Sequence, residues 1–163
     1  MLMLIASVSL FAATSFPSFV GTDLSGNPVD DSIFKGKVTV VNFWFSTCPP
    51  CIAELPELDK LNKELQAKGG MVIGINVDTL DDNEKMIEKA KSILKTKGAT
   101  YRNITFPSST EAGKLVRTIM AYPTTYVVDK NGNIVGSPIV GGITSRSLKR
   151  RLLETIDKAY AIN

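Results

Sequence analysis

The chain has 163 residues with a formal net charge of +3 at pH 7, and it contains two cysteines and no histidine. Its length and its 44% hydrophobic residues are typical of one soluble globular domain, and the mild charge without a basic block argues against a nucleic-acid partner. With this cysteine and histidine content, a Cys–His hydrolase, a Ser–His–Asp triad and a zinc site of four Cys or His ligands cannot be built within the chain.

Residues 1–13 form an apolar segment that ends in small residues and is too short to cross a bilayer as a helix. The segment resembles the core and cleavage region of a secretory signal, although the first basic residue is Lys35. We therefore expect residues 1–15 to be a signal or anchor remnant, or else an ordinary packed N-terminal extension. Residues 16–163 are expected to form the domain.

A turn signal at 25–28, Ser-Gly-Asn-Pro, separates short apolar pieces and predicts an N-terminal β-hairpin. Lys-Gly-Lys at 35–37 marks the next turn and leads into a strand at 38–45. This strand has apolar residues on both faces, as expected at the centre of a sheet that is covered on both sides.

The two cysteines follow this strand in the order Cys48-Pro49-Pro50-Cys51. Proline suits the first helical position and disfavours the α conformation in the residue before it, which predicts a helix that begins no earlier than Pro50. Cys48 would then lie just outside the helix, where free N–H groups and the helix dipole favour a thiolate. Cys48 is the predicted attacking sulfur, and Cys51, buried behind it, is the predicted resolving thiol. Two alternatives are half of an intermolecular site and buried structural thiols.

The remaining elements are predicted from apolar periodicity and from Gly and Pro breaks. The first helix continues to about residue 67 with a kink at Pro56, and a buried strand at 71–77 completes a parallel unit with the strand at 38–45. The other expected elements are a helix entry at 78–83, a helix up to Gly98, a short strand at 100–105 and a short helix at 112–119. They are followed by a strand at 121–129 that is entered through a proline, a turn at 130–133, a strand at 134–140 and a helix at about 145–160.

Four features together resemble the thioredoxin fold from about residue 16 onward: Trp44 in the strand before the cysteines, Pro56 five residues after the second cysteine, Pro123 at a later strand entry, and the strand order. The resemblance implies a thioredoxin-like α/β sandwich, with a central mixed β-sheet, helices on both faces and an N-terminal β-hairpin extension. Within that fold the chain is similar to the TlpA/ResA-like membrane-anchored or secreted thiol-disulfide oxidoreductases of bacteria. The residues that match this family are Phe19, Asp23, Gly26, Lys35-Gly36-Lys37, Asn42-Phe43-Trp44, Cys48, Cys51, Glu54 and Pro56.

The resemblance implies an extracytoplasmic reductant, periplasmic or associated with the cell envelope, with a cytoplasmic location as the alternative. Its substrates would be oxidised proteins, in cytochrome c maturation or general disulfide repair, and a membrane or soluble thiol reductant would recharge it. The N-terminus would be a possible membrane attachment, and neither a cofactor nor a metal site is expected. Pro49 and Pro50 donate no N–H to Cys48, so the Cys48 thiolate is weakly stabilised. We therefore expect the reduction potential of the cysteine pair to lie nearer the about −270 mV of thioredoxin than the about −120 mV of a strong oxidant.

Glu54 lies three residues after Cys51 on the same predicted helical face, where it could move the proton of Cys51. Cytoplasmic thioredoxins carry a buried Asp, the proton acceptor for the second cysteine, where this chain has Asn42, and the resemblance makes Glu54 the candidate to replace it. The alternative is an exposed acid that complements the helix N-terminus.

The predicted substrate-binding residues are Tyr122, Pro123, Thr47 and Pro49. The resemblance implies a cis Tyr122–Pro123 bond that faces the cysteines, with the Tyr122 backbone pairing with an extended substrate. Thr47 replaces a Trp that is common in the family, so part of the usual docking surface is altered. Met120 and Tyr126 either edge the substrate groove or belong to the core.

Two other functions are compatible with the sequence. A peroxiredoxin shares the fold, but its motif places Thr three residues before the reactive Cys, where this chain has Phe45. A copper(I) chaperone could use the two thiolates, because soft sulfur ligands select that ion. Related copper carriers also use a downstream His, for which Met120 is the only substitute that the sequence suggests.

Overall fold

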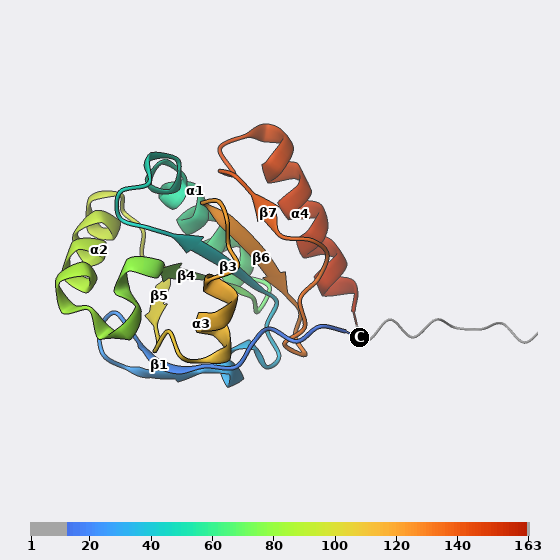
Figure 1. Ribbon diagram of the computed structural model, residues 1–163. Coiled ribbons are helices and arrows are strands. Elements are labelled where there is room, and N and C mark those ends of the chain that lie inside the picture. The colour runs from blue at the N-terminus through green and yellow to red at the C-terminus, as the bar shows by residue number, and fades with distance from the viewer. Residues whose placement is uncertain (1–12, 163) are drawn as a thin grey trace, which may run out of the picture.

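The computed structural model describes residues 13–162. Seven strands form one sheet in the order β2-β1-β5-β4-β3-β6-β7 (Figure 1). β4 pairs in parallel with both β3 and β5, and every other pairing is antiparallel, so the sheet is mixed as predicted. The strands are β1 (Val20–Asp23), β2 (Pro28–Asp30), β3 (Thr39–Trp44), β4 (Met71–Asn76), β5 (Arg102–Thr105), β6 (Thr124–Val128) and β7 (Ile139–Val140).

Helices cover both faces of this sheet (Figure 1). They are α1 (Pro49–Gln66), α2 (Glu84–Thr96), α3 (Glu111–Val116) and α4 (Arg146–Ala161), with short 3₁₀ turns η1 (Asp31–Phe34) and η2 (Val77–Asp82). One core contains apolar side chains of α1, α2 and α4, and the other contains those of α3, η1 and the segment before β1. This arrangement confirms the thioredoxin-like sandwich.

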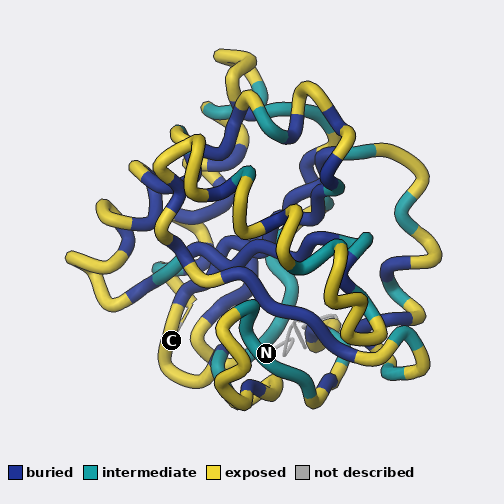
Figure 2. The backbone as a smooth tube through the Cα atoms, turned by 90° about the vertical axis from the view of Figure 1, so that its left-hand side faces the viewer, coloured by how far each residue is buried: buried dark blue, intermediate teal, exposed yellow. Residues whose placement is uncertain are grey.

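β3 is the central strand that carries the chain to the cysteines. All six of its residues are buried, and Figure 2 shows buried backbone running through the middle of the molecule. Side chains alternate along a strand, so Val40 and Trp44 pack in the core under α1 while Val41 and Phe43 pack in the opposite core. The same alternation places Asn42 on the α1 side of the sheet.

The predicted N-terminal hairpin is confirmed. β1 and β2 pair antiparallel around a turn in which Gly26 has a φ of 87°, a conformation that glycine adopts without a steric penalty. The Asp23 carboxylate accepts the N–H groups of Ser25 at 2.9 Å and Asn27 at 3.0 Å, which closes the turn.

Several predicted boundaries were wrong: the helix expected to reach 119 ends at Val116, and the strand expected from 121 begins at Thr124. Two others have an identifiable physical cause. α1 begins at Pro49 rather than Pro50, because Pro49 has no N–H and so lacks one of the groups that would clash with the following proline ring. The expected strand at 134–140 is reduced to β7 and a single bridge between Val128 and Ile134. Gly136, with a φ of 68°, and Pro138, which has no N–H to donate, interrupt the ladder between them.

Most of the predicted signal or anchor segment, residues 1–12, lies outside the described residues. The two residues that precede the domain boundary we expected are in contact with the sheet. The Ile134 N–H donates to the Thr14 carbonyl at 2.8 Å, and Ser15 forms a bridge with Asn133. Across residues 13–162, no helix combines the length and the apolar character needed to cross a membrane.

Candidate active site

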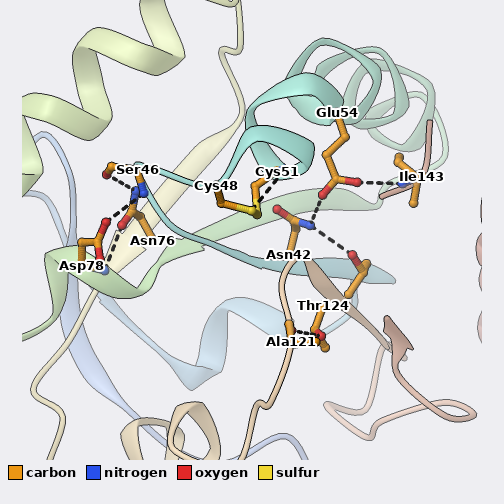
Figure 3. Close-up of a disulfide and its surroundings, with 11 residues drawn as sticks. Asn42, Ser46, Cys48, Cys51, Glu54, Asn76, Asp78, Ala121, Thr124 and Ile143 are labelled. Atoms are coloured by element: carbon orange, nitrogen blue, oxygen red, sulfur yellow. Dashed lines mark hydrogen bonds between the residues drawn. A yellow bond between two sulfur atoms is a disulfide. The ribbon is translucent and has the colours of Figure 1, made fainter. Parts of the chain in front are cut away.

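The two cysteines lie where β3 ends and α1 begins, and they form a disulfide with a Cα–Cα distance of 5.3 Å (Figure 3). Cys48 is the N-cap residue of α1, and Cys51 lies in the first turn. The Cys51 N–H donates to the Cys48 Sγ at 3.3 Å. The predicted placement of Cys48 outside the helix and Cys51 inside it is therefore confirmed.

The Cys48 sulfur receives little help from the helix N-terminus. Pro49 and Pro50 have no N–H, and the Ile52 N–H is already bonded to the Cys48 carbonyl at 3.0 Å. Within the described chain, the Cys51 N–H is the one hydrogen-bond donor to this sulfur. The sequence also has no Lys or Arg between Lys37 and Lys60. A thiolate at Cys48 is thus only weakly stabilised by its local surroundings.

Both cysteines are buried in the disulfide form, with 2% of Cys48 and none of Cys51 exposed to solvent. The residues that flank Cys48 differ from it, because Thr47, Pro49 and Pro50 are exposed. The surface next to the disulfide is therefore made by a small hydroxyl side chain and two proline rings.

A polar network holds the turn that precedes Cys48. The Asp78 carboxylate accepts the Ser46 N–H at 2.8 Å, and the Asn76 side-chain amide donates to the Ser46 hydroxyl at 2.9 Å (Figure 3). The Asn76 amide oxygen in turn accepts the Asp78 N–H at 2.9 Å. Sequence reasoning missed this network, and the only available signal was that polar residues follow β3 and β4 where these parallel strands end at the same edge of the sheet.

Glu54 is fully buried in the first turns of α1, so the alternative of an exposed acid was wrong. Its Oε1 accepts the Asn42 side-chain N–H at 2.8 Å, and its Oε2 accepts the Ile143 backbone N–H at 2.8 Å (Figure 3). Burial raises the pKa of Glu54 to about 7, although both hydrogen bonds oppose this shift by favouring the carboxylate. A carboxyl group that is half ionised near neutral pH can both accept and release a proton there.

The Tyr122–Pro123 segment lies beside the turn that precedes the cysteines. Its peptide bond is cis, as the resemblance implied, and Pro123 is buried. The Tyr122 ring packs edge-on against Phe45, with 5.4 Å between ring centroids. Burial raises the pKa of Tyr122, and the negative charge of Asp78 adds to this effect.

Hydrogen bonds on both sides of Tyr122 fix this segment. The Gly141 N–H donates to the Pro123 carbonyl at 2.8 Å, and the Thr124 hydroxyl donates to the Ala121 carbonyl at 2.8 Å. Within residues 13–162, neither backbone polar group of Tyr122 itself forms a hydrogen bond.

Met120 and Tyr126, the two residues expected either to edge the substrate groove or to belong to the core, differ in their burial. Met120 is 92% exposed next to the Tyr122–Pro123 segment, so it does not belong to the core. Tyr126 packs edge-on against Phe43, with 5.8 Å between ring centroids, on the opposite face of β3 from Asn42. Tyr126 is therefore partly buried and packs against the second core.

Comparison with known proteins gives concordant results. The redoxin family profile matches residues 11–152. The thiol-disulfide oxidoreductase ResA of Bacillus thuringiensis subsp. konkukian is 30% identical over 139 residues, which cover 83% of this chain and 73% of the relative.

Two solved structures share the fold over most of their length. A thioredoxin-family thiol:disulfide interchange protein from Chlorobium tepidum is 28% identical with a TM-score of 0.66, over 88% of this chain and 97% of its own. A secreted thiol-disulfide isomerase from Corynebacterium glutamicum is 28% identical with a TM-score of 0.68, over 87% of this chain and 85% of its own. With a Cys48–Cys51 disulfide at the N-terminus of α1, the chain belongs to the redoxin family and is a ResA-like thiol-disulfide oxidoreductase of the thioredoxin superfamily.

Proposed function

We propose that this oxidoreductase works as an extracytoplasmic reductant of protein disulfides. The observation that carries the proposal is the poor donor environment of Cys48, which receives a single N–H from the helix that follows it. A weakly stabilised thiolate makes the reduced pair less stable, and a less stable reduced pair gives electrons away more readily.

The reaction has two thiol-exchange steps. The Cys48 thiolate attacks one sulfur of a substrate disulfide, a mixed disulfide forms and the first substrate thiolate leaves. The Cys51 sulfur then attacks Cys48 Sγ, the Cys48–Cys51 bond forms and the second substrate thiolate leaves. Two electrons pass from the cysteine pair to the substrate, and a thiol reductant must supply two electrons to restore the pair.

Glu54 serves the second step in this proposal, because Cys51 must lose its proton before it attacks. Glu54 follows Cys51 by three residues on one face of α1, and both side chains are buried on the sheet side of the helix. Its raised pKa, near 7, lets the carboxylate take up a proton at neutral pH. Glu54 is therefore the proposed general base for resolution.

The substrate chain docks on the surface beside the disulfide in this proposal. The free N–H and carbonyl of Tyr122 would pair with an extended segment of the oxidised protein, next to the buried Pro123. Thr47 and Pro49 flank Cys48 and would contact the same segment. A small residue at 47 leaves this surface open to bulky substrate side chains.

The proposed location outside the cytoplasm is supported by the similarity to the secreted Corynebacterium glutamicum protein. The proposed partners are oxidised proteins, together with a membrane or soluble thiol reductant. Membrane attachment through the N-terminus remains a proposal about residues 1–12, which the structure does not describe.

Mixed-disulfide trapping tests the assignment of the two cysteines. In Cys51→Ser the second step is blocked, so incubation of the reduced protein with an oxidised substrate protein should accumulate a covalent complex through Cys48. Cys48→Ser is the matched control and should form far less complex, because Cys51 lies inside the first turn of α1 whereas Cys48 is the N-cap residue between the exposed Thr47 and Pro49. Equal trapping by both variants would refute the assignment.

A further inference from the structure

The side chain of Asn42 lies between Glu54 and the disulfide in Figure 3. Its amide nitrogen is fully hydrogen-bonded, whereas its amide oxygen has no hydrogen-bond donor among the described residues. Its Nδ2 donates to Glu54 Oε1 at 2.8 Å and to the Thr125 hydroxyl at 3.1 Å. Its Oδ1 is buried and accepts no hydrogen bond from any residue between 13 and 162. Buried polar atoms in folded proteins are nearly always hydrogen-bonded, so an open acceptor calls for an explanation.

The orientation of the amide is determined by its neighbours. An ionised carboxylate can only accept hydrogen bonds, so the nitrogen of Asn42 faces the ionised form of Glu54. The opposite end of the amide then faces away from Glu54. Figure 3 shows the Asn42 oxygen on the side of the Cys48–Cys51 disulfide.

A disulfide offers no donor to this oxygen, but a reduced cysteine does. Reduction breaks the S–S bond with two electrons from a dithiol reductant, which is itself oxidised to a disulfide and releases two protons. One proton stays on Cys51 as a thiol, and the other goes to solvent and leaves Cys48 as a thiolate. A thiol S–H is a weak hydrogen-bond donor, and an amide oxygen is a suitable acceptor. Of the two sulfurs, Cys48 is the proposed attacking thiolate, which carries no S–H to donate, and its Sγ accepts the Cys51 N–H at 3.3 Å. Cys51 is fully buried in the same core as the residues of α1 that face the sheet.

We propose that Asn42 is a positioning residue whose Oδ1 accepts the S–H of Cys51 in the reduced protein. This inference rests on the proposed role of Cys51 as the resolving thiol. The hydrogen bond exists only in the reduced state, so it stabilises that state relative to the disulfide. Through its two ends, the Asn42 amide holds the Cys51 thiol and the Glu54 carboxylate in a fixed relation before proton transfer.

Infrared spectroscopy of the S–H stretch tests the proposal directly, because the band moves to lower frequency when the thiol donates a hydrogen bond. Cys48→Ala leaves Cys51 as the only thiol and removes Cys48 Sγ, a competing acceptor. In this variant we expect a low-frequency band. Adding Asn42→Leu should return the band to the frequency of a free thiol. Two results would overturn the proposal. One is a band at the free-thiol frequency in Cys48→Ala itself, and the other is a band whose frequency is the same with and without Asn42→Leu.

Thr125→Val is the matched control, because it removes a partner of the Asn42 nitrogen and leaves Oδ1 and the Glu54 contact in place. The low-frequency band should persist in Cys48→Ala/Thr125→Val. In proteins with both cysteines, Asn42→Leu should also lower the equilibrium constant for reduction by about two- to tenfold, the size of one neutral hydrogen bond. Thr125→Val should leave that constant unchanged.

A measurement on the unaltered protein covers the case in which Asn42→Leu does not fold. The side-chain carbonyl ¹³C resonance of Asn42 should move downfield when the disulfide is reduced, since its oxygen gains a donor, and an unchanged resonance would refute the hydrogen bond. Failure of the proposed function would give a different result. The wild-type protein would then exchange no thiols with oxidised substrates, whether or not the Asn42 resonance moves on reduction.

Discussion

Glu54 and Ile143 are 89 residues apart in the chain, yet the Ile143 backbone N–H donates to Glu54 Oε2 at 2.8 Å in the core. Together with the bond from Asn42 to Oε1, this contact gives each carboxylate oxygen one donor. The donors favour ionisation, and burial opposes it more strongly, which leaves the pKa of Glu54 at about 7. The segment between β7 and α4 therefore helps to set the acidity of a group beside the cysteines.

Glu54→Gln should slow the closure of the Cys48–Cys51 bond from a mixed disulfide. We expect a loss of roughly 100-fold at pH 7, near the lower end of what general acid–base catalysis contributes. The wild-type closure rate should rise with pH through a step near 7, and this step should be missing in the variant. Stopped-flow measurement of closure across pH tests both expectations.

The control for this experiment is Glu57→Gln, which removes a carboxylate one turn further along α1. Glu57 is paired with Lys149 at 2.7 Å on the protein surface and does not face the cysteines. Its closure rate should match that of the wild type. A rate in Glu54→Gln that follows the wild-type profile at every pH would exclude Glu54 as the base.

The stability of the oxidised protein should fall as the pH rises through about 7. The pKa of Glu54 is raised from 4.5 to about 7 in the folded state, so the folded state binds this proton more tightly than the unfolded chain does. The resulting stability is fully present below about pH 4.5 and is lost as the pH rises through about 7. The shift corresponds to about 3 kcal/mol in the free energy of unfolding.

Urea unfolding of the oxidised protein at pH 5 and pH 8 captures most of this difference in the free energy of unfolding, and the disulfide form avoids any contribution from cysteine ionisation. In Glu54→Gln the carboxyl group is absent, so its share of the pH dependence should disappear. Identical pH dependence in the two proteins would mean that Glu54 is ionised in the fold over the whole range.

Pro50→Ala should make the cysteine pair more oxidising. The N-cap side chain of a helix accepts N–H groups from the second or third helical residue, and Pro50 occupies the second position without an N–H to offer. Alanine restores that donor, stabilises the Cys48 thiolate and should raise the reduction potential by roughly 30 mV, which corresponds to about 1.4 kcal/mol. Equilibration with dithiol buffers of known potential provides the measurement.

Pro49→Ala is the matched control for this variant. Position 49 is the first helical residue, whose N–H does not reach the N-cap side chain. The reduction potential of Pro49→Ala should stay within a few millivolts of the wild-type value. This change is small against the roughly 30 mV expected for Pro50→Ala. Equal shifts in the two variants would point to altered helix packing instead of a restored hydrogen bond.

Much of the fold was predictable because its determinants are local. The turn at 25–28, the helix that starts beside Cys48 and the alternation along β3 follow from short-range spacing and from the steric rules of proline and glycine. The sequence also indicated that Glu54 shares a helical face with Cys51. These features need no knowledge of which distant segments meet.

The parts of the site that could not be predicted from the sequence depend on contacts between segments that are far apart in the chain. The bond from Ile143 to Glu54 uses a backbone N–H, which every residue except proline carries, so no residue type marks it. The contact between Ser46 and Asp78 spans 32 residues and follows from where two parallel strands end. The short β7, in contrast, could have been predicted from the sequence. Gly136 and Pro138 both disfavour a continuous strand at 134–140.

The most direct test of the proposed reductant is the reduction potential of the Cys48–Cys51 pair in the unaltered protein. Equilibration against defined dithiol buffers, with the two redox forms separated after acid quenching, gives this value. The single hydrogen bond to Cys48 predicts a potential below about −230 mV. A potential between about −120 and −180 mV would contradict the proposal and identify the protein as an oxidant or isomerase.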